Sequence, residues 1–340
     1  MTESSLSHGE TMSVPERPFS RARVARSVAG YGIATALMLI TPLLVFAPAS
    51  LFHCAMRNSR VAAWSAALVA TGLAGLVTQI VTSPADAKLT TASYLGIVLS
   101  VVVPTVAAMP LVDQRRKFGT VLMFAVIVGT AGLALTEVVM RTMSFSPYTV
   151  QVQQVTVMTN QVATIVKQSA VQESQLWLLR RIPLLVPAMA IVQVALVFLL
   201  SLMMYGRLSA WRGFVLRGGN PAQLRQTYLF RNLQLPDWVL FLFVAGGVTP
   251  LLTGVWQAIA ANVLAIVVCL YLLQGVSIFR SLLVRAGAGM IGSAFGFFIL
   301  AMLCLTGIGL VLLAGAGLFD PFVDFRKLNR KDDSHESHTD

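Results

Sequence analysis

The feature that most limits what this sequence can fold into is a series of long apolar runs without charge, such as residues 91–112 and 257–279. A helix of about 20 residues spans a bilayer core roughly 30 Å thick. Of the 340 residues, 56% are hydrophobic and only 11% are charged, whereas soluble domains are about 25% charged. The short alternating segments of an outer-membrane barrel are missing. The sequence therefore predicts an all-α fold, a polytopic transmembrane helical bundle.

Two kinds of apolar segment make up this bundle. The terminal segments 27–56 and 288–318 are longer than one crossing needs and too short for two. Pro42 and Pro48 interrupt the first segment, and glycines near residue 307 interrupt the last, so each is expected to be a broken hairpin. The other six segments are clear membrane helices, at about 61–81, 91–112, 118–141, 180–205, 237–255 and 257–279.

The distribution of Lys and Arg favours these hairpins. If both terminal segments return to their own side, 20 of the 25 basic residues lie on one side and five on the other. If each segment crosses once, the split is 13 to 12. Positive charge collects on the cytoplasmic side of membrane proteins. We therefore expect both termini to be cytoplasmic, in a bacterial inner (cytoplasmic) membrane, and the net charge of +11 needs no nucleic acid as partner.

Outside the bilayer the chain offers tails and two loops. Residues 1–26 are expected to be a disordered basic cytoplasmic tail, 27–318 the transmembrane bundle, and 319–340 a cytoplasmic juxtamembrane tail. The outer loop 142–178 has apolar residues at helical spacing, which favours an amphipathic helix on the outer surface. Its alternating sequence VQVQQV leaves a strand open. The inner loop 206–236 contains five arginines interleaved with aromatic residues.

The inner loop suggests a surface that contacts lipid or protein. Arg212, Arg217 and Arg225 have no acidic neighbour before Asp237. Between two membrane helices, such a loop is suited to anionic lipid headgroups. A docking surface for a cytoplasmic partner fits the same pattern.

Two aspartates four residues apart, Asp320 and Asp324, follow the last apolar segment. On a helix they share one face and could hold a cation. However, Asp320 followed by Pro321 is typical of a helix N-cap, and Asp324 can pair with Lys327 or Arg326. We therefore expect a structural anchor in contact with lipid or a partner, and keep a catalytic or metal-binding pair as the alternative.

Polar residues within the apolar helices are the candidates for a substrate site, because polar groups in a membrane usually face the bundle interior. Glu137 is the only acid well inside an expected helix. In the predicted orientation, most of these candidates fall toward the outer face, where they could form the mouth of a pocket. The alternatives are an ion pair of Glu137 with Arg141, an aromatic belt, and hydrogen bonds between helices. The predicted substrate-binding residues are Glu137, Arg141, Gln193, Trp256, Gln257 and Asn262.

Known catalytic signatures are missing from the sequence. It contains no Walker A loop, no G-x-S-x-G, no H-E-x-x-H and no C-x-x-C. No catalytic residue, metal ligand or cofactor is therefore predicted. A membrane-embedded enzyme that acts on lipids through Asp320, Asp324 and Glu137 remains the least supported alternative.

Three motifs carry a resemblance to a known family: LPDW at 235–238, LLQG at 272–275 and GLFDPFVDFRK at 317–327. Together with the Pro-broken entry FAPASLFHCAMRNSRVAAWSAAL at 46–68, this pattern resembles the YybS-like family of uncharacterised bacterial inner-membrane proteins. The resemblance extends over roughly residues 27–328. That family is distantly similar to the substrate-binding components of energy-coupling-factor transporters. The resemblance thus implies a helical bundle with an outward-facing pocket, and a coupling membrane protein and ATPases as partners.

Two functional hypotheses follow. The first is a small-solute-binding transporter component of the energy-coupling-factor type, with its pocket around Glu137, Trp256 and Gln257. The second is a membrane scaffold without a small-molecule ligand, which recruits cytoplasmic partners through its basic inner loops.

Overall fold

The computed structural model describes residues 21–83, 86–114, 116–168, 181–216, 228–323 and 325. These residues form helices and no strand, which confirms the all-α prediction. Within them, five helices are long and apolar enough to cross a membrane. They are α3 (Arg60–Val81), α4 with α5 (Ala87–Ile97 and Val103–Asp113), α6 (Phe118–Thr142), η4 with α9 (Ile182–Leu185 and Val186–Leu216) and α11 (Gly254–Arg285).

The first terminal segment is a helical hairpin, as predicted. Helix α1 (Arg21–Leu39) ends where Pro42 begins a 3-10 turn, η1 (Pro42–Phe46), and α2 (Ala47–Arg57) follows. Proline has no backbone N–H and its ring crowds the preceding turn, so it favours the break that is seen here. The Thr35 hydroxyl donates to Ser50 Oγ at 3.0 Å, and Asn58 Nδ2 donates to Ser27 Oγ at 2.9 Å. These two bonds join the helices as antiparallel neighbours.

The last terminal segment is broken as well. Helices α12 (Met290–Leu305) and α13 (Ile308–Val323) meet at a bend of 110°. Gly307 lies at the bend with a φ of +78°, a backbone conformation that residues with a Cβ rarely adopt. The predicted glycine break is therefore confirmed.

The expected helix over 237–255 is different in the structure. It is a nine-residue helix, α10 (Val239–Gly247), followed by a 3-10 turn, η7 (Thr249–Leu251). Nine residues rise only about 14 Å, less than half of the bilayer core. Gly246, Gly247 and Pro250 favour an early helix end, and the apolar run alone did not reveal it.

Close packing of small residues holds the N-terminal helices together. Helix α3 buries six alanines, at positions 62, 63, 66, 67, 70 and 74. Between α4 and α5 the chain makes a π-helical turn, η3 (Val98–Val102). Pro104 cannot donate to the Ser100 carbonyl, and that carbonyl faces Gly129 of α6, where an ideal Cβ would lie only 2.8 Å away. Small residues thus let the helix backbones approach each other, as in other membrane bundles.

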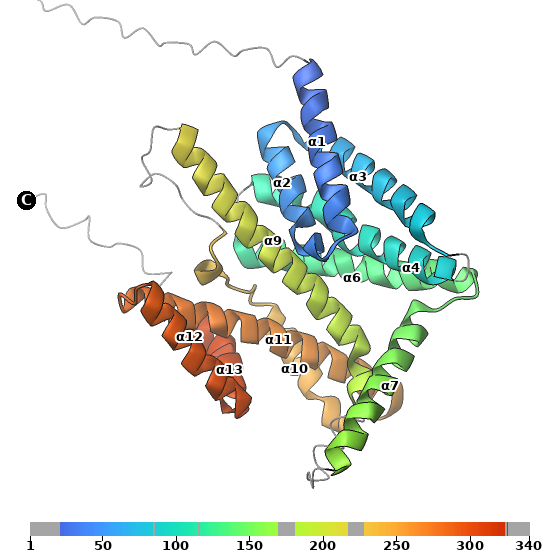
Figure 1. Cartoon of the computed structure of the whole chain (residues 1–340). Helices are drawn as coiled ribbons and strands as arrows, with labels where there is room; N and C mark the ends of the chain where they lie inside the picture. The colour runs from blue at the N-terminus through green and yellow to red at the C-terminus, as the bar shows by residue number, and fades with distance from the viewer. Residues whose placement is uncertain are drawn as a thin grey trace, which may run out of the picture.

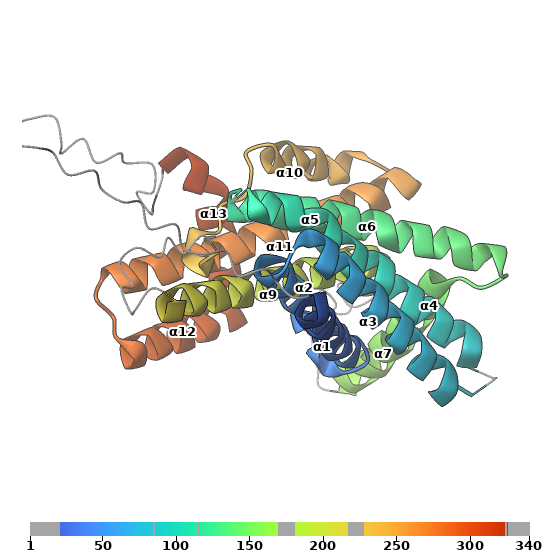
Figure 2. The same cartoon turned by 90° about the horizontal axis from the view of Figure 1, so that it is seen from above.

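Helix α9 lies between two groups of helices (Figure 1). Its contacts reach α2, α6 and η1 on one side and α11 on the other. From above, α12 and α13 lie at one end of the molecule and α3, α4 and α7 at the other (Figure 2). The Ser201 hydroxyl of α9 donates to the Val45 carbonyl of η1. Helix α9 therefore connects the N-terminal group to the C-terminal group.

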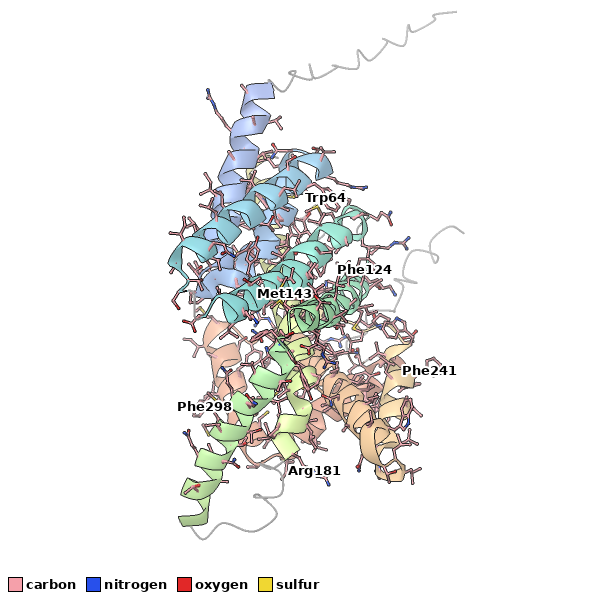
Figure 3. The ribbon with its side chains drawn as sticks, turned by 90° about the vertical axis from the view of Figure 1, so that its right-hand side faces the viewer. Trp64, Phe124, Met143, Arg181, Phe241 and Phe298 are labelled. Atoms are coloured by element: carbon pink, nitrogen blue, oxygen red, sulfur yellow. The ribbon has the colours of Figure 1, made fainter. Side chains whose placement is uncertain are left out.

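Many large apolar side chains lie on the outside of the bundle. Trp64 is 54% exposed, Phe241 74% and Phe298 58%, and all three lie at the surface in Figure 3. In a soluble protein such a surface would be unusual, whereas lipid tails are as apolar as these side chains. The long apolar helices and this surface are those of an integral membrane protein.

The loop 142–178, which the sequence predicts to lie outside, contains a helix and no strand in its described residues, 142–168. Helix α7 (Pro147–Gln168) begins five residues after the end of α6. Residues 169–178 of this loop lie outside the described part of the chain. The helical spacing of the apolar residues was therefore the correct signal.

Candidate functional site

Glu137 has a structural role in the described structure. Its carboxylate accepts hydrogen bonds from Arg141 Nε at 2.9 Å, from Ser146 Oγ at 2.6 Å and from the Tyr148 backbone N–H at 3.0 Å. Tyr148 is the second residue of α7, where a carboxylate is favourable. Glu137 thus joins the end of α6 to the start of α7, and the expected pair with Arg141 is present.

Asn262 has a comparable role elsewhere. Its Oδ1 accepts from the Ala188 N–H at 2.9 Å, while its Nδ2 donates to the carbonyls of Leu184 at 2.9 Å and Ala258 at 2.8 Å. These bonds attach α11 to the start of α9. The hydrogen bonds between helices that the sequence offered as an alternative therefore occur here.

The remaining predicted substrate residues lie at the surface or near it. Gln193 is exposed on α9, Trp256 is 69% exposed near the start of α11, and Gln257 is half-buried beside it. The described contacts of Glu137 and Asn262 share no residue, and the pocket described below is lined by none of the predicted residues. That these residues bind a solute stays a prediction.

Asp320 corrects the prediction made for it. It is not an N-cap, because α13 runs through Asp320 and Pro321 to Val323. Its side chain is only 2% exposed, so it does not contact lipid. Asp320 Oδ2 accepts from Gln274 Nε2 at 3.1 Å. The helix continues because α13 packs closely on α11: an ideal Cβ on Gly317 would lie 2.1 Å from the Tyr271 carbonyl.

The other predicted contact residues are described only in part. Arg212 lies in the last turns of α9, which extends beyond the expected span to Leu216. Arg217, Arg225, Asp324 and Arg326 lie outside the described residues. Their proposed contacts with lipid or a partner stay predictions.

Three motifs that are distant in the sequence meet at one buried junction. The Leu235 N–H, from LPDW, donates to Gln274 Oε1 at 3.1 Å. Gln274, from LLQG, in turn donates to Asp320, from the C-terminal motif. The Ser277 hydroxyl, one turn along α11, donates to the Phe230 carbonyl at 2.7 Å. These bonds hold the segment 228–235 against α11 and α13.

The same segment is fixed on its other face by aromatic contacts. The rings of Phe52, Tyr205, Tyr228 and Phe118 follow one another at centroid distances of 5.7, 5.9 and 5.8 Å. Tyr205 is 8% exposed and Tyr228 only 4%. Tyr205 and Tyr228, at the two ends of the basic loop, are therefore core residues. The sequence had suggested that this loop lies at the membrane surface.

Next to this segment the structure forms a pocket of about 190 Å³. It lies where α9, α11 and the segment 228–235 meet, and Figure 1 shows this segment between the two helices. Three arginines from three separate parts of the chain line it: Arg207 of α9, Arg231 of η6 (Phe230–Asn232) and Arg280 of α11. The other lining residues are Met203, Tyr228, Leu229, Phe230 and Val284. We call this site the arginine pocket.

Helical spacing explains how these side chains reach one place. Met203 and Arg207 are four residues apart on α9, and Arg280 and Val284 are four apart on α11, so each pair shares a helix face. The Ser277 bond to Phe230 fixes the intervening segment one turn from Arg280. Each wall of the arginine pocket is therefore held by the core.

The electrostatics of the pocket are one-sided. Three arginines and no acidic side chain are found among the described residues that line it. Like charges gathered in one concave site repel each other, and an anion relieves that repulsion. In the described residues, no group of three His, Cys, Asp or Glu side chains is placed to hold a metal ion. The arginine pocket is therefore suited to an anion and not to a cation.

The sequence contained only an indirect signal for this pocket. Charge counting placed Arg207, Arg231 and Arg280 on the same side of the membrane, but their convergence depends on how α9 and α11 cross.

The described structure defines an all-α integral membrane protein with a basic pocket at one end of its helices. No family model, curated protein or solved structure matches the chain. The resemblance to YybS-like proteins and its implied partners therefore stay predictions.

Proposed function

We propose that this integral membrane protein binds an anionic ligand, with a phosphate or similar group, in the arginine pocket. The observation that carries the proposal is the convergence of Arg207, Arg231 and Arg280 from three separate segments. Arginine presents a planar fork of donors that matches phosphate oxygens, and bonds to charged groups contribute about 1.5–3 kcal/mol each. A few such bonds are enough for micromolar binding.

The side of the membrane follows from the charge distribution. In the proposed orientation, with both termini in the cytoplasm of a bacterial cell, the arginine pocket faces the cytoplasm. It therefore lies opposite the outward-facing site that the resemblance implies. A transporter component with a coupling protein and ATPases remains a separate proposal, and it depends on the outer residues Glu137, Trp256 and Gln257.

The test compares binding of anionic probes to matched variants. The purified protein in neutral detergent is titrated with two probes, dioleoyl phosphatidic acid and glycerol 3-phosphate. Binding is measured by native mass spectrometry and by the shift in unfolding temperature. For the double variant Arg207→Gln, Arg280→Gln we expect affinity for the bound probe to fall about 100-fold, roughly tenfold for each lost charged contact.

Arg285→Gln is the matched control, because Arg285 lies on α11 near Arg280, is exposed and does not line the pocket. It should retain the affinity of the unchanged protein within a factor of two to three, the effect of a solvent-exposed charge. Equal losses in both variants would mean attraction by net charge, and no binding of either probe would overturn the proposal.

A further inference from the structure

We infer that the anion in the arginine pocket is the phosphate of a membrane lipid, with its acyl chains beside the apolar outer surface of α11 and α12. The inference rests on the proposed function and names the chemical class of its ligand. Three observations support it: the depth of the pocket, the composition of its lining, and the surface beside it.

The depth of the arginine pocket is that of lipid headgroups. Arg207 is the first charged residue after the uncharged run 182–206, which forms most of η4 and α9. Arg280 is likewise the first charged residue of α11, after the uncharged run 254–279. Arginines at such positions extend their guanidinium groups to the level of the phosphates.

The lining is half apolar. Met203, Leu229, Phe230 and Val284 surround the three arginines together with Tyr228. A site for a small soluble anion needs donors around the whole ligand, since an oxygen left against apolar atoms loses its hydration. An amphiphile with an anionic head and an apolar body matches both halves of the lining.

The surface beside the pocket is open and apolar. Val284, which lines the pocket, is 43% exposed, and Leu282 on the same helix is 44% exposed. On the next helix Phe295 and Phe298 are 64% and 58% exposed, and the neighbouring Phe297 contacts Phe279, the residue before Arg280. Arg207 and Arg231 are exposed as well. At the edge of the arginine pocket, a charged surface therefore lies next to an apolar one. A headgroup can thus reach the arginines from the side while its chains stay in the hydrocarbon layer.

The experiment separates the lipid from a soluble anion. The protein is placed in phosphatidylcholine nanodiscs with or without phosphatidic acid, and retained lipid is identified by native mass spectrometry. In parallel, glycerol 3-phosphate, which has the same anionic group without acyl chains, is titrated in neutral detergent. We expect phosphatidic acid to be retained over phosphatidylcholine, and glycerol 3-phosphate to bind at least about tenfold more weakly than the lipid in the same detergent.

The variants make the outcomes distinct. Selective retention that Arg280→Gln abolishes and Arg285→Gln preserves supports a lipid in this pocket. Equal binding of glycerol 3-phosphate and phosphatidic acid would overturn the lipid assignment and leave the proposed anion site intact. No binding of either probe would overturn both. Selective capture of an acidic peptide in place of lipid would also overturn the inference, and would favour the scaffold hypothesis.

Discussion

The two terminal hairpins look alike in sequence and differ in the structure. Both are apolar segments of about 30 residues with a break near the middle, at Pro42 in one and Gly307 in the other. Helix α2 of the first hairpin buries six residues, including Leu51 and Phe52, whereas α12 of the second buries none. One hairpin is therefore part of the core, while the other attaches mainly through α13.

The difference teaches which residues mark a buried helix in a membrane protein. Helix α2 contains alanines and α3 buries an alanine face, whereas α12 contains Phe295, Phe297 and Phe298. Lipid does not drive large apolar side chains inward, so close contact between backbones decides which helices are buried. In α3, where the six buried residues are alanines, small residues identify the buried face better than hydropathy does.

The largest expected effect tests the buried hairpin. Phe52→Ala removes a ring that is 1% exposed and contacts Tyr205. We expect a loss of about 3–5 kcal/mol in the free energy of unfolding, measured by denaturant titration in mixed micelles, because the ring leaves a cavity. Phe298→Ala in α12 is the matched control, since Phe298 is 58% exposed and faces the membrane. Similar losses in both variants would contradict the distinction between the hairpins.

The next effect tests the attachment of the second hairpin. An ideal Cβ on Gly275 would lie 2.0 Å from the Leu313 carbonyl, so Gly275→Ala must push α13 away from α11. We expect a loss of about 1–3 kcal/mol, the usual cost of overpacking. At Gly315 of α13 nothing lies within 4 Å of an added Cβ. Gly315→Ala should therefore be neutral or slightly stabilising, because alanine has the higher helix propensity. A loss as large as that of Gly275→Ala would mean that the close approach of α13 to α11 is not the reason why Gly275→Ala destabilises.

A third prediction concerns the buried junction behind that hairpin. Gln274→Leu replaces the amide with an apolar side chain of similar size. The change removes the hydrogen bonds to Leu235 and Asp320. We expect a loss of about 1–3 kcal/mol, because buried polar groups lose their partner. Limited proteolysis should detect faster cleavage near residues 228–235. Gln79→Leu, an exposed glutamine of α3, is the control and should change neither quantity.

The smallest expected effect tests a hydrogen bond within the first hairpin. Thr35→Val removes the hydroxyl that donates to Ser50 and keeps the shape of the side chain. Hydrogen bonds between membrane helices average about 0.6 kcal/mol, so we expect a loss of that size in the same titration. A loss as large as that of Phe52→Ala would mean that polar contacts, and not packing, hold this hairpin in the core.

Much of the fold could be predicted from sequence because the bilayer imposes simple rules. Long apolar runs indicated α3 to α6, α9 and α11, and Pro42 and Gly307 marked the breaks. The short α10 was missed because Gly246, Gly247 and Pro250 favour its early end, and a hydropathy average does not register these helix-breaking residues. Asp320 was misplaced because local N-cap chemistry was outweighed by the close packing of α13 on α11.

The arginine pocket could not be predicted from the sequence, and the solute site that the sequence suggested stays a prediction. The residues chosen for a pocket, such as Glu137 and Asn262, are hydrogen-bonded at helix junctions. Polarity within an apolar helix indicates that a partner exists, not whether that partner is a ligand or the chain itself. The arginine pocket depends on residues 207, 231 and 280 approaching one another, and such tertiary proximity leaves no periodic trace in the sequence.

The position of α9 has a mechanical consequence for this pocket. Arg207 belongs to the helix that packs against α2 and α6, and Arg280 to the helix that supports α12 and α13. An anion bound there, as we propose, would act as a clamp across the two groups of helices. Any movement that separates α9 from α11 must weaken its binding, and its binding must resist that movement by the same free energy. The occupancy of the pocket and the angle between the two halves are thus a single coupled equilibrium.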